Sequence, residues 1–122
     1  MISVVDDDRS VVEAIVSLLE SVGYTAAGFV SALDFLNSPQ LRLTACLILD
    51  VHMPGIGGIE LQQRLAAENV LMPIIFITAH GDQELPAGVV GAGATALVRK
   101  PFSQESLLGA LRSALNAARR TS

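Results

Sequence analysis

The stretch ISVVDDD at residues 2–8 sets a short apolar run directly against three aspartates. A second apolar run, CLIL at residues 46–49, stops in the same way at Asp50. If both runs are buried parallel strands, their carboxyl ends lie at one edge of a sheet and bring the carboxylates together there. Carboxylates that lie close together repel one another unless a cation neutralises them. The two runs therefore predict a parallel sheet with a metal site at its edge.

Apolar runs of strand length alternate along the chain with segments of helical period. Val12, Ile15 and Leu19 have the spacing of one face of an amphipathic helix, and Gly23 is a natural C-cap for it. Such alternation is typical of repeated βα units around a parallel sheet, and we expect one α/β domain over residues 1–122. The expected strands are residues 2–6, 24–29, 45–50, 74–78 and 95–98.

Local signals mark where the helices begin and end. Asp8 is the expected N-cap of the first helix, and Ser31 that of a short second helix, which Pro39 limits. Residues 58–67 are expected to form the third helix, and Ser103 is expected to cap the fifth. Before the fifth strand, proline and glycine disfavour a helix by roughly 3 and 1 kcal/mol per residue, so we expect a short, weakly held fourth helix. These residues are Pro86, Gly88, Gly91 and Gly93.

Composition limits the classes of function. The formal net charge is −4, so this segment offers no cationic face to nucleic acid. Hydrophobic residues make up 51% of the chain, yet no uninterrupted apolar run approaches the ~18 residues of a membrane span. No secretory signal precedes the first strand, and we therefore expect a cytoplasmic location. The single cysteine, Cys46, is expected to be a small buried side chain.

Ligands of an open parallel α/β sheet bind beyond the carboxyl ends of its strands. The polar residues expected there are Asp6, Asp7, Asp50, Thr78 and Lys100. Asp6 and Asp7 supply the oxygen ligands that Mg²⁺ takes, and Asp50 is placed to act as both ligand and nucleophile. An ammonium group offsets the charge that builds on a transferred phosphoryl group, which is the role expected of Lys100. The set predicts phosphoryl transfer to Asp50.

Each of these residues also has a plainer interpretation. Residues 6–8 can form a solvated turn that ends in a helix cap. Lys100, the only lysine among 8 basic residues, can be a solvated surface charge. The Thr78 hydroxyl and the N–H of Ala79 are expected to donate to phosphoryl oxygens. Thr78 can instead be a β-branched residue at the end of a strand. The convergence of several such groups at one sheet edge favours a shared site.

Four motifs, in their order and spacing, resemble those of the receiver domain of bacterial two-component response regulators. They are VVDDD at residues 4–8, LDVHMPG at 49–55, ITA at 77–79 and KPF at 100–102. The resemblance spans nearly the whole chain, and segments 50–65 and 74–82 are most similar to receivers attached to helix-turn-helix transcription regulators. It implies a flavodoxin-like (βα)5 fold, a three-layer sandwich around a parallel sheet in the order 2-1-3-4-5.

The resemblance also implies roles for individual residues. Asp50 is the phosphoacceptor, which takes a phosphoryl group from the phosphohistidine of a histidine kinase. The implied ligands of Mg²⁺, or of Mn²⁺ in its place, are Asp6, Asp7, Asp50 and the backbone carbonyl of His52. The implied contacts of the phosphoryl group are Thr78, Ala79 and Lys100. Beyond self-phosphorylation from small phosphodonors and self-dephosphorylation, no enzyme activity is expected.

The chain departs from the pattern of the family it resembles in the Pro/Gly-rich fourth helix, which lies in the switching face, and at one position of the fifth strand. Receivers usually carry Tyr or Phe three residues before the lysine, and this ring turns inward as the threonine moves toward the phosphoryl group. Here that position is Leu97, so the switch formed with Thr78 has no ring. His52 and His80 each stand at a position that in the family borders the phosphoryl group and sets how quickly water reaches it. They either modulate its lifetime or are unremarkable loop residues.

The resemblance implies protein partners. These are a sensor histidine kinase or a histidine phosphotransfer protein, an output domain outside this segment and a phosphorylation-dependent homodimer, with a stand-alone receiver as the alternative. Direct contact with nucleic acid or membrane is not expected. Two rival functions remain: a hydrolase with an aspartyl-phosphate intermediate, for which the chain lacks the length of a substrate cap, and a pseudo-receiver that only binds proteins.

Overall fold

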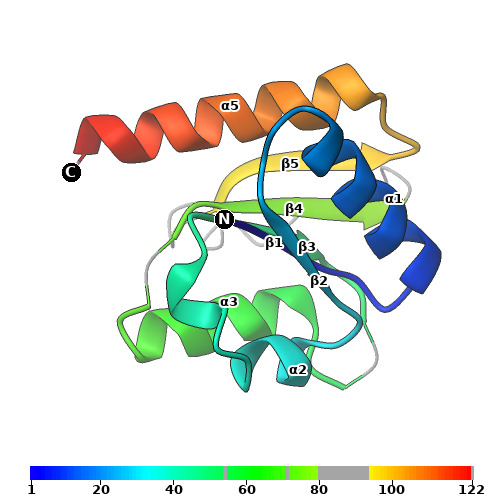
Figure 1. The fold of residues 1–122 in the computed structure, drawn as a ribbon. Helices are drawn as coiled ribbons and strands as arrows, with labels where there is room; N and C mark the ends of the chain where they lie inside the picture. The colour runs from blue at the N-terminus through cyan, green and yellow to red at the C-terminus, as the bar shows by residue number, and fades with distance from the viewer. Residues whose placement is uncertain (54, 71, 80–93, 122) are drawn as a thin grey trace.

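The computed structural model describes residues 1–53, 55–70, 72–79 and 94–121 (Figure 1). Strands and helices alternate along these residues as the sequence predicts. The strands are β1 (Ile2–Val5), β2 (Ala26–Phe29), β3 (Cys46–Asp50), β4 (Ile74–Ala79) and β5 (Ala94–Lys100). The helices are α1 (Arg9–Ser21), α2 (Ala32–Leu36), the short 3₁₀ helix η1 (Leu41–Leu43), α3 (Gly58–Ala67) and α5 (Gln104–Thr121). The predicted fourth helix falls within residues 80–93, outside the described residues.

The strands form one parallel sheet in the order β2-β1-β3-β4-β5. Helices α1 and α5 cover one face of this sheet, and α2 and α3 cover the other (Figure 1). In the register, Val5 lies opposite Leu49, and Asp50 lies opposite Ile77. The flavodoxin-like fold and the strand order predicted from the sequence are confirmed.

Two apolar cores hold the three layers together. The core between the sheet and helices α1 and α5 contains Val4, Ile48 and Leu111. The core on the other face contains Leu49, with Leu61 from α3 packed against the sheet. Because β1 and β3 are covered on both faces, their side chains are buried without alternation, which explains the continuous apolar runs of the sequence.

The helix starts follow the predicted capping residues. The Asp8 side chain accepts a hydrogen bond from the N–H of Ser10 (2.9 Å), and Ser31 caps α2 in the same manner. The Ser103 hydroxyl accepts from the N–H of Ser106, in the first turn of α5 (3.0 Å). Gly23, just beyond α1, has a φ of +98°, a conformation that glycine adopts without strain. These local predictions are confirmed.

Strand boundaries differ from the prediction at several ends. Strand β5 runs to Lys100 rather than Val98, because Arg99 and Lys100 still pair with Thr78 and Ala79 of β4. Pairing uses the backbone, so charged side chains do not end a strand that has a neighbour. Strand β2 begins two residues later than predicted, and η1 was not predicted. Within the described part of the chain, no helix is both long and apolar enough to cross a membrane.

Candidate functional site

Strand periodicity brings charged side chains to one side of the carboxyl edge. Successive side chains of a strand point to opposite faces, so residues two apart share a face. Asp6 lies two residues beyond Val4, and Asp50 two beyond Ile48, both of which belong to the core under α1 and α5. Lys100 lies two residues beyond Val98 of β5, which belongs to the same core. The three charged groups therefore extend one apolar face of the sheet into a polar site.

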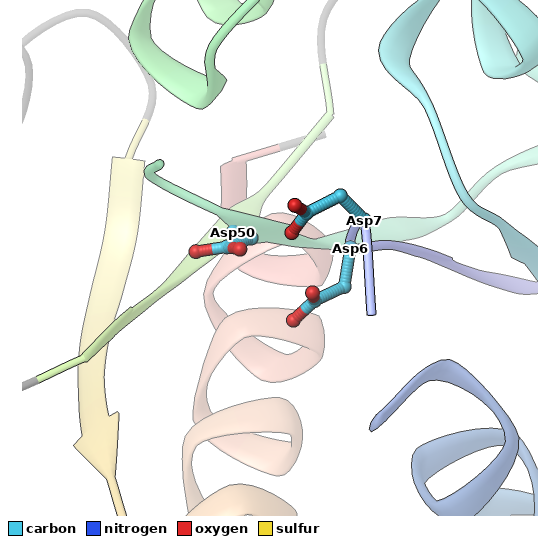
Figure 2. Close-up of side chains that lie close together, drawn as sticks. All are labelled: Asp6, Asp7 and Asp50. Carbon is cyan, nitrogen blue, oxygen red and sulfur yellow. The ribbon is translucent and has the colours of Figure 1, made fainter. Parts of the chain in front are cut away.

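The carboxylates of Asp6, Asp7 and Asp50 form a cluster at this edge, with ligand atoms within 4.8 Å of one another. Figure 2 shows the side chains converging, two from the end of β1 and one from the end of β3. Asp6 and Asp50 are only 1% and 5% exposed, whereas Asp7 is exposed. Clustered hard oxygen donors with one member open to solvent fit Mg²⁺, which takes one or two carboxylates and keeps several waters.

Both buried carboxylates are oriented by the backbone that follows them. Oδ1 of Asp6 accepts a hydrogen bond from the N–H of Asp8 (2.9 Å), and Oδ1 of Asp50 accepts one from the N–H of His52 (3.2 Å). Oδ2 of Asp6 accepts a hydrogen bond from Nζ of Lys100 (3.1 Å), which is also an ion pair. The single lysine of the chain therefore lies within the site, as predicted.

Electrostatics within the cluster act most clearly on Asp50. The pKa of Asp50 is raised to about 6: burial and the charges of Asp6 and Asp7 raise it, while Lys100 and the hydrogen bond from the N–H of His52 oppose the rise. Burial is the largest of these effects, because a carboxylate removed from water is destabilised relative to its neutral form. The edge of the sheet therefore gives Asp50 an affinity for a proton or another cation.

The remaining predicted phosphoryl contacts lie close to Asp50 in the sheet. Asp50 pairs with Ile77, so Thr78 is the next residue of the neighbouring strand, and it is 2% exposed. Ala79 ends β4 and pairs with Lys100. The structure thus brings together the ends of β1, β3, β4 and β5, as the sequence predicts.

Two of the predicted modulating and switch residues are also described. His52 is exposed, and it lines a surface hollow of about 460 Å³ together with Val51 and Met53 next to Asp50. Leu97 lies on β5 opposite Phe76 and is 36% exposed, so its side chain reaches the surface. His80 lies outside the described residues.

One residue at the site was not singled out from the sequence for this role. The sequence predicted Gly58 only as the start of the third helix, yet Gly58 begins α3 directly against the backbone of Asp50 and Val51. A side chain at Gly58 would collide with the carbonyl oxygen of Asp50. The available signal was a glycine at the first position of the predicted helix, because glycine is favoured where two backbone segments approach closely.

The geometry agrees with what comparisons with known proteins show. Residues 2–112 match the family model of the response regulator receiver domain. The chain belongs to this family. The resemblance inferred from the four motifs is thereby confirmed.

The chain is similar to several curated bacterial proteins, two of which are named transcriptional regulatory proteins TdiR and FixJ. Response regulator protein TmoT of Ectopseudomonas mendocina is 45% identical over 118 residues, which cover 97% of this chain and 54% of TmoT. Nodulation protein W of Bradyrhizobium diazoefficiens is 40% identical, covering 91% of this chain and 49% of that protein. The chain spans about half the length of the curated relatives it matches.

Solved structures of receiver proteins have the same fold. Response regulator StyR superposes with a TM-score of 0.90 at 43% identity, covering 98% of this chain and 62% of that chain. A response regulator receiver protein from Burkholderia phymatum has a TM-score of 0.80 at 44% identity and covers 94% of both chains. Identity at this level extends the likeness beyond the fold to the family.

Proposed function

We propose that this receiver domain takes a phosphoryl group onto Asp50 from the phosphohistidine of a sensor histidine kinase or a histidine phosphotransfer protein, in a reaction that depends on Mg²⁺. The observation that carries the proposal is the cluster at the sheet edge. It joins three carboxylates with the Lys100 ammonium, 3.1 Å from Asp6. A structural role alone does not account for three carboxylates and an ammonium group that meet at one edge of the sheet.

The transfer forms one bond and breaks one. An oxygen of the Asp50 carboxylate attacks phosphorus in line with the P–N bond of the donor, the new O–P bond forms, and the P–N bond breaks. The imidazole leaves with the electron pair of that bond and takes up a proton. Attack by water on phosphorus later releases inorganic phosphate and regenerates the carboxylate. Asp50 thus carries the signal as an acyl phosphate.

The residues around Asp50 divide the remaining work. Asp6 and Asp7, with the carboxylate of Asp50 and the carbonyl of His52, are the proposed ligands of the divalent cation. When bound, the cation neutralises charge on the phosphoryl oxygens. Lys100 exchanges its partner Asp6 for a phosphoryl oxygen. The remaining proposed donors to the phosphoryl group are the Thr78 hydroxyl and the Ala79 N–H.

The partner that delivers the phosphoryl group is proposed to dock beside Lys100. An apolar hollow of about 240 Å³ lies between α1 and the start of α5, and its lining includes Ile15, Leu18, Phe102 and the side chain of Lys100. An apolar groove of this kind fits one face of a helix. A helix that carries the donor histidine would thus approach Asp50 from the side on which Lys100 lies.

Incubation with acetyl phosphate and Mg²⁺, followed by intact mass measurement, tests the proposal. We expect the wild type to gain the mass of one phosphoryl group, and Asp50→Asn to gain none. Asp34→Asn, which changes an exposed aspartate of α2, is the matched control and should be phosphorylated like the wild type. A folded wild type that gains no mass would instead support the pseudo-receiver, and turnover of a phosphomonoester would support the hydrolase.

The output of the domain is proposed to be a change in its interactions. Several relatives are named transcriptional regulatory proteins, and in a regulator of that kind the receiver would control an attached output domain or a homodimer. Leu97 provides no aromatic ring for the usual switch with Thr78. We propose that the phosphorylation chemistry is retained, while the surface around β5 changes conformation differently from that of receivers with an aromatic switch residue. Hydrogen exchange with and without beryllofluoride tests this difference.

A further inference from the structure

The start of α3 is fixed to the backbone immediately after Asp50. The N–H of Gly58 donates to the carbonyl oxygen of Val51 (3.0 Å), and the N–H of Val51 donates to the carbonyl oxygen of Ile77 in β4 (3.0 Å). Val51 is thus held from two sides, by the neighbouring strand and by the first residue of the helix. The position of the phosphoacceptor strand end depends on both contacts.

Gly58 leaves no room for a side chain. A Cβ at this position would collide with the carbonyl oxygen of Asp50 and lie 3.0 Å from Cα of Val51 and 3.1 Å from the carbonyl carbon of Asp50. All three of these atoms belong to the backbone, so no flexible side chain can move aside. The φ of Gly58 lies outside the left-handed region, so the glycine is required by space and not by conformation.

The atoms that such a side chain would displace are the ones that orient the site. The Asp50 carboxylate hangs from this backbone, and its Oδ1 is held by the N–H of His52 two residues later (3.2 Å). The carbonyl of His52, a proposed cation ligand, belongs to the same turn. A shift of the Asp50 and Val51 peptide is therefore passed on to both the nucleophile and the metal ligands.

We propose that Gly58 is a positioning residue for the phosphoacceptor: the absent side chain lets α3 hold the Asp50–Val51 backbone where the carboxylate meets its cation and its phosphodonor. This inference rests on the proposed function of Asp50. A displacement of about 1 Å at a reacting group slows a reaction by as much as ~100-fold. A side chain at position 58 should accordingly slow phosphorylation more than loss of folded protein alone would.

A series of three glycine variants separates position from stability. Gly58→Ala places its Cβ against the Asp50 backbone, whereas the Cβ of Gly57→Ala approaches only the carbonyl oxygen of Val51, at 3.3 Å. Gly109→Ala, in α5, meets nothing within 4 Å and is the matched control. For each variant, phosphorylation by acetyl phosphate is timed by intact mass, Mg²⁺ affinity is measured by calorimetry, and the melting temperature is recorded.

The expected order of effect is Gly58→Ala, then Gly57→Ala, then Gly109→Ala. Phosphorylation should slow by about tenfold or more in the first and roughly twofold to threefold in the second, with Mg²⁺ affinity falling in parallel. Gly109→Ala should match the wild type in phosphorylation rate and in Mg²⁺ affinity. In the metal-free protein, the backbone amide resonance of His52 should shift in the same order, which destabilisation of an undistorted fold would not produce.

The inference is overturned if folded Gly58→Ala keeps the wild-type rate, Mg²⁺ affinity and His52 resonance. If Gly58→Ala does not fold, Gly57→Ala decides, and an unchanged rate and resonance in that variant overturn the inference. A wild type that takes up no phosphoryl group refutes the proposed function, while a displaced His52 resonance in the metal-free variants still reports on the role of Gly58 in positioning the Asp50 turn.

Discussion

The carboxyl ends of β1 and β3 are built from the same parts but are neutralised differently. Asp6 and Asp50 are both buried, and each accepts a hydrogen bond from the N–H two residues later. Lys100 forms its ion pair with Asp6, whereas the pKa of Asp50 is raised to about 6 by burial and by its acidic neighbours. The sheet edge therefore keeps the Asp6 carboxylate paired and leaves the Asp50 carboxylate with an affinity for a cation.

Removing the ammonium should have the largest effect on this arrangement. Lys100→Met keeps the aliphatic stem but withdraws the charge that offsets the transferred phosphoryl group, so phosphorylation by acetyl phosphate should slow by about 100-fold. Mg²⁺ binding should persist, because Asp6 loses a competing cation. Rates from intact mass and affinities from calorimetry measure the two effects.

Arg99→Met provides the control for this change, since Arg99 is the exposed neighbour of Lys100 on the same strand. Its rate should equal that of the wild type. Equal rates in Lys100→Met and the wild type would show that Lys100 only neutralises Asp6 and takes no part in phosphorylation.

Removing one carboxylate from the end of β1 should weaken cation binding. Asp6→Asn and Asp7→Asn each withdraw an anionic donor, and we expect Mg²⁺ affinity to fall by about tenfold in each variant. Asp8→Asn changes the adjacent exposed aspartate, which caps α1, and should bind Mg²⁺ like the wild type. Calorimetric titration checks the order, and an unchanged affinity in Asp7→Asn would remove that residue from the site.

Neutralising the end of β3 should stabilise the metal-free protein. Asp50→Asn removes a charge that burial and the acidic neighbours destabilise, and after allowance for screening by water we expect about 1 kcal/mol of added stability at neutral pH. Urea unfolding without Mg²⁺ measures this difference. A less stable variant would mean that the Asp50 charge is favourable in the fold, and that the ends of β1 and β3 do not differ in this respect.

The pH dependence of stability follows from the same pKa. Asp50 binds its proton more tightly in the folded state than in the unfolded state. Its contribution to the stability of the fold is therefore fully present below about pH 4 and is lost as the pH rises through about 6. The stability gap between Asp50→Asn and the wild type should therefore open over this interval. Urea unfolding of both proteins at several pH values measures the gap, and a constant gap would contradict the prediction.

Much of this arrangement was predictable because it depends on local or periodic features. The two apolar runs that end at Asp6 and Asp50 predict neighbouring buried strands, and parallel pairing then requires their carboxylates to meet. The cap at Asp8 depends only on the following residues of its helix, and the structure has it as predicted. The convergence of Lys100 on the same edge follows from the order of the strands.

Other features depend on tertiary packing and have no clear local signal. Lys100 lies inside β5 rather than beyond it, because pairing with β4 extends the strand. The choice of Asp6 as the lysine's partner depends on the distance from β1 to β5 across β3 and β4, which no pattern in the sequence fixes. The close approach of Gly58 to Asp50 arises only when α3 packs against the end of β3.

Borohydride reduction of the phosphorylated protein identifies the residue that accepts the phosphoryl group. An aspartyl phosphate is reduced to homoserine, so peptide sequencing by mass spectrometry identifies the residue that carried the phosphoryl group. After incubation with acetyl phosphate and Mg²⁺, we predict homoserine at position 50 and at no other aspartate, with none formed when Mg²⁺ is chelated. Homoserine at another position, or none in a folded protein that binds Mg²⁺, would show that Asp50 is not the phosphoacceptor.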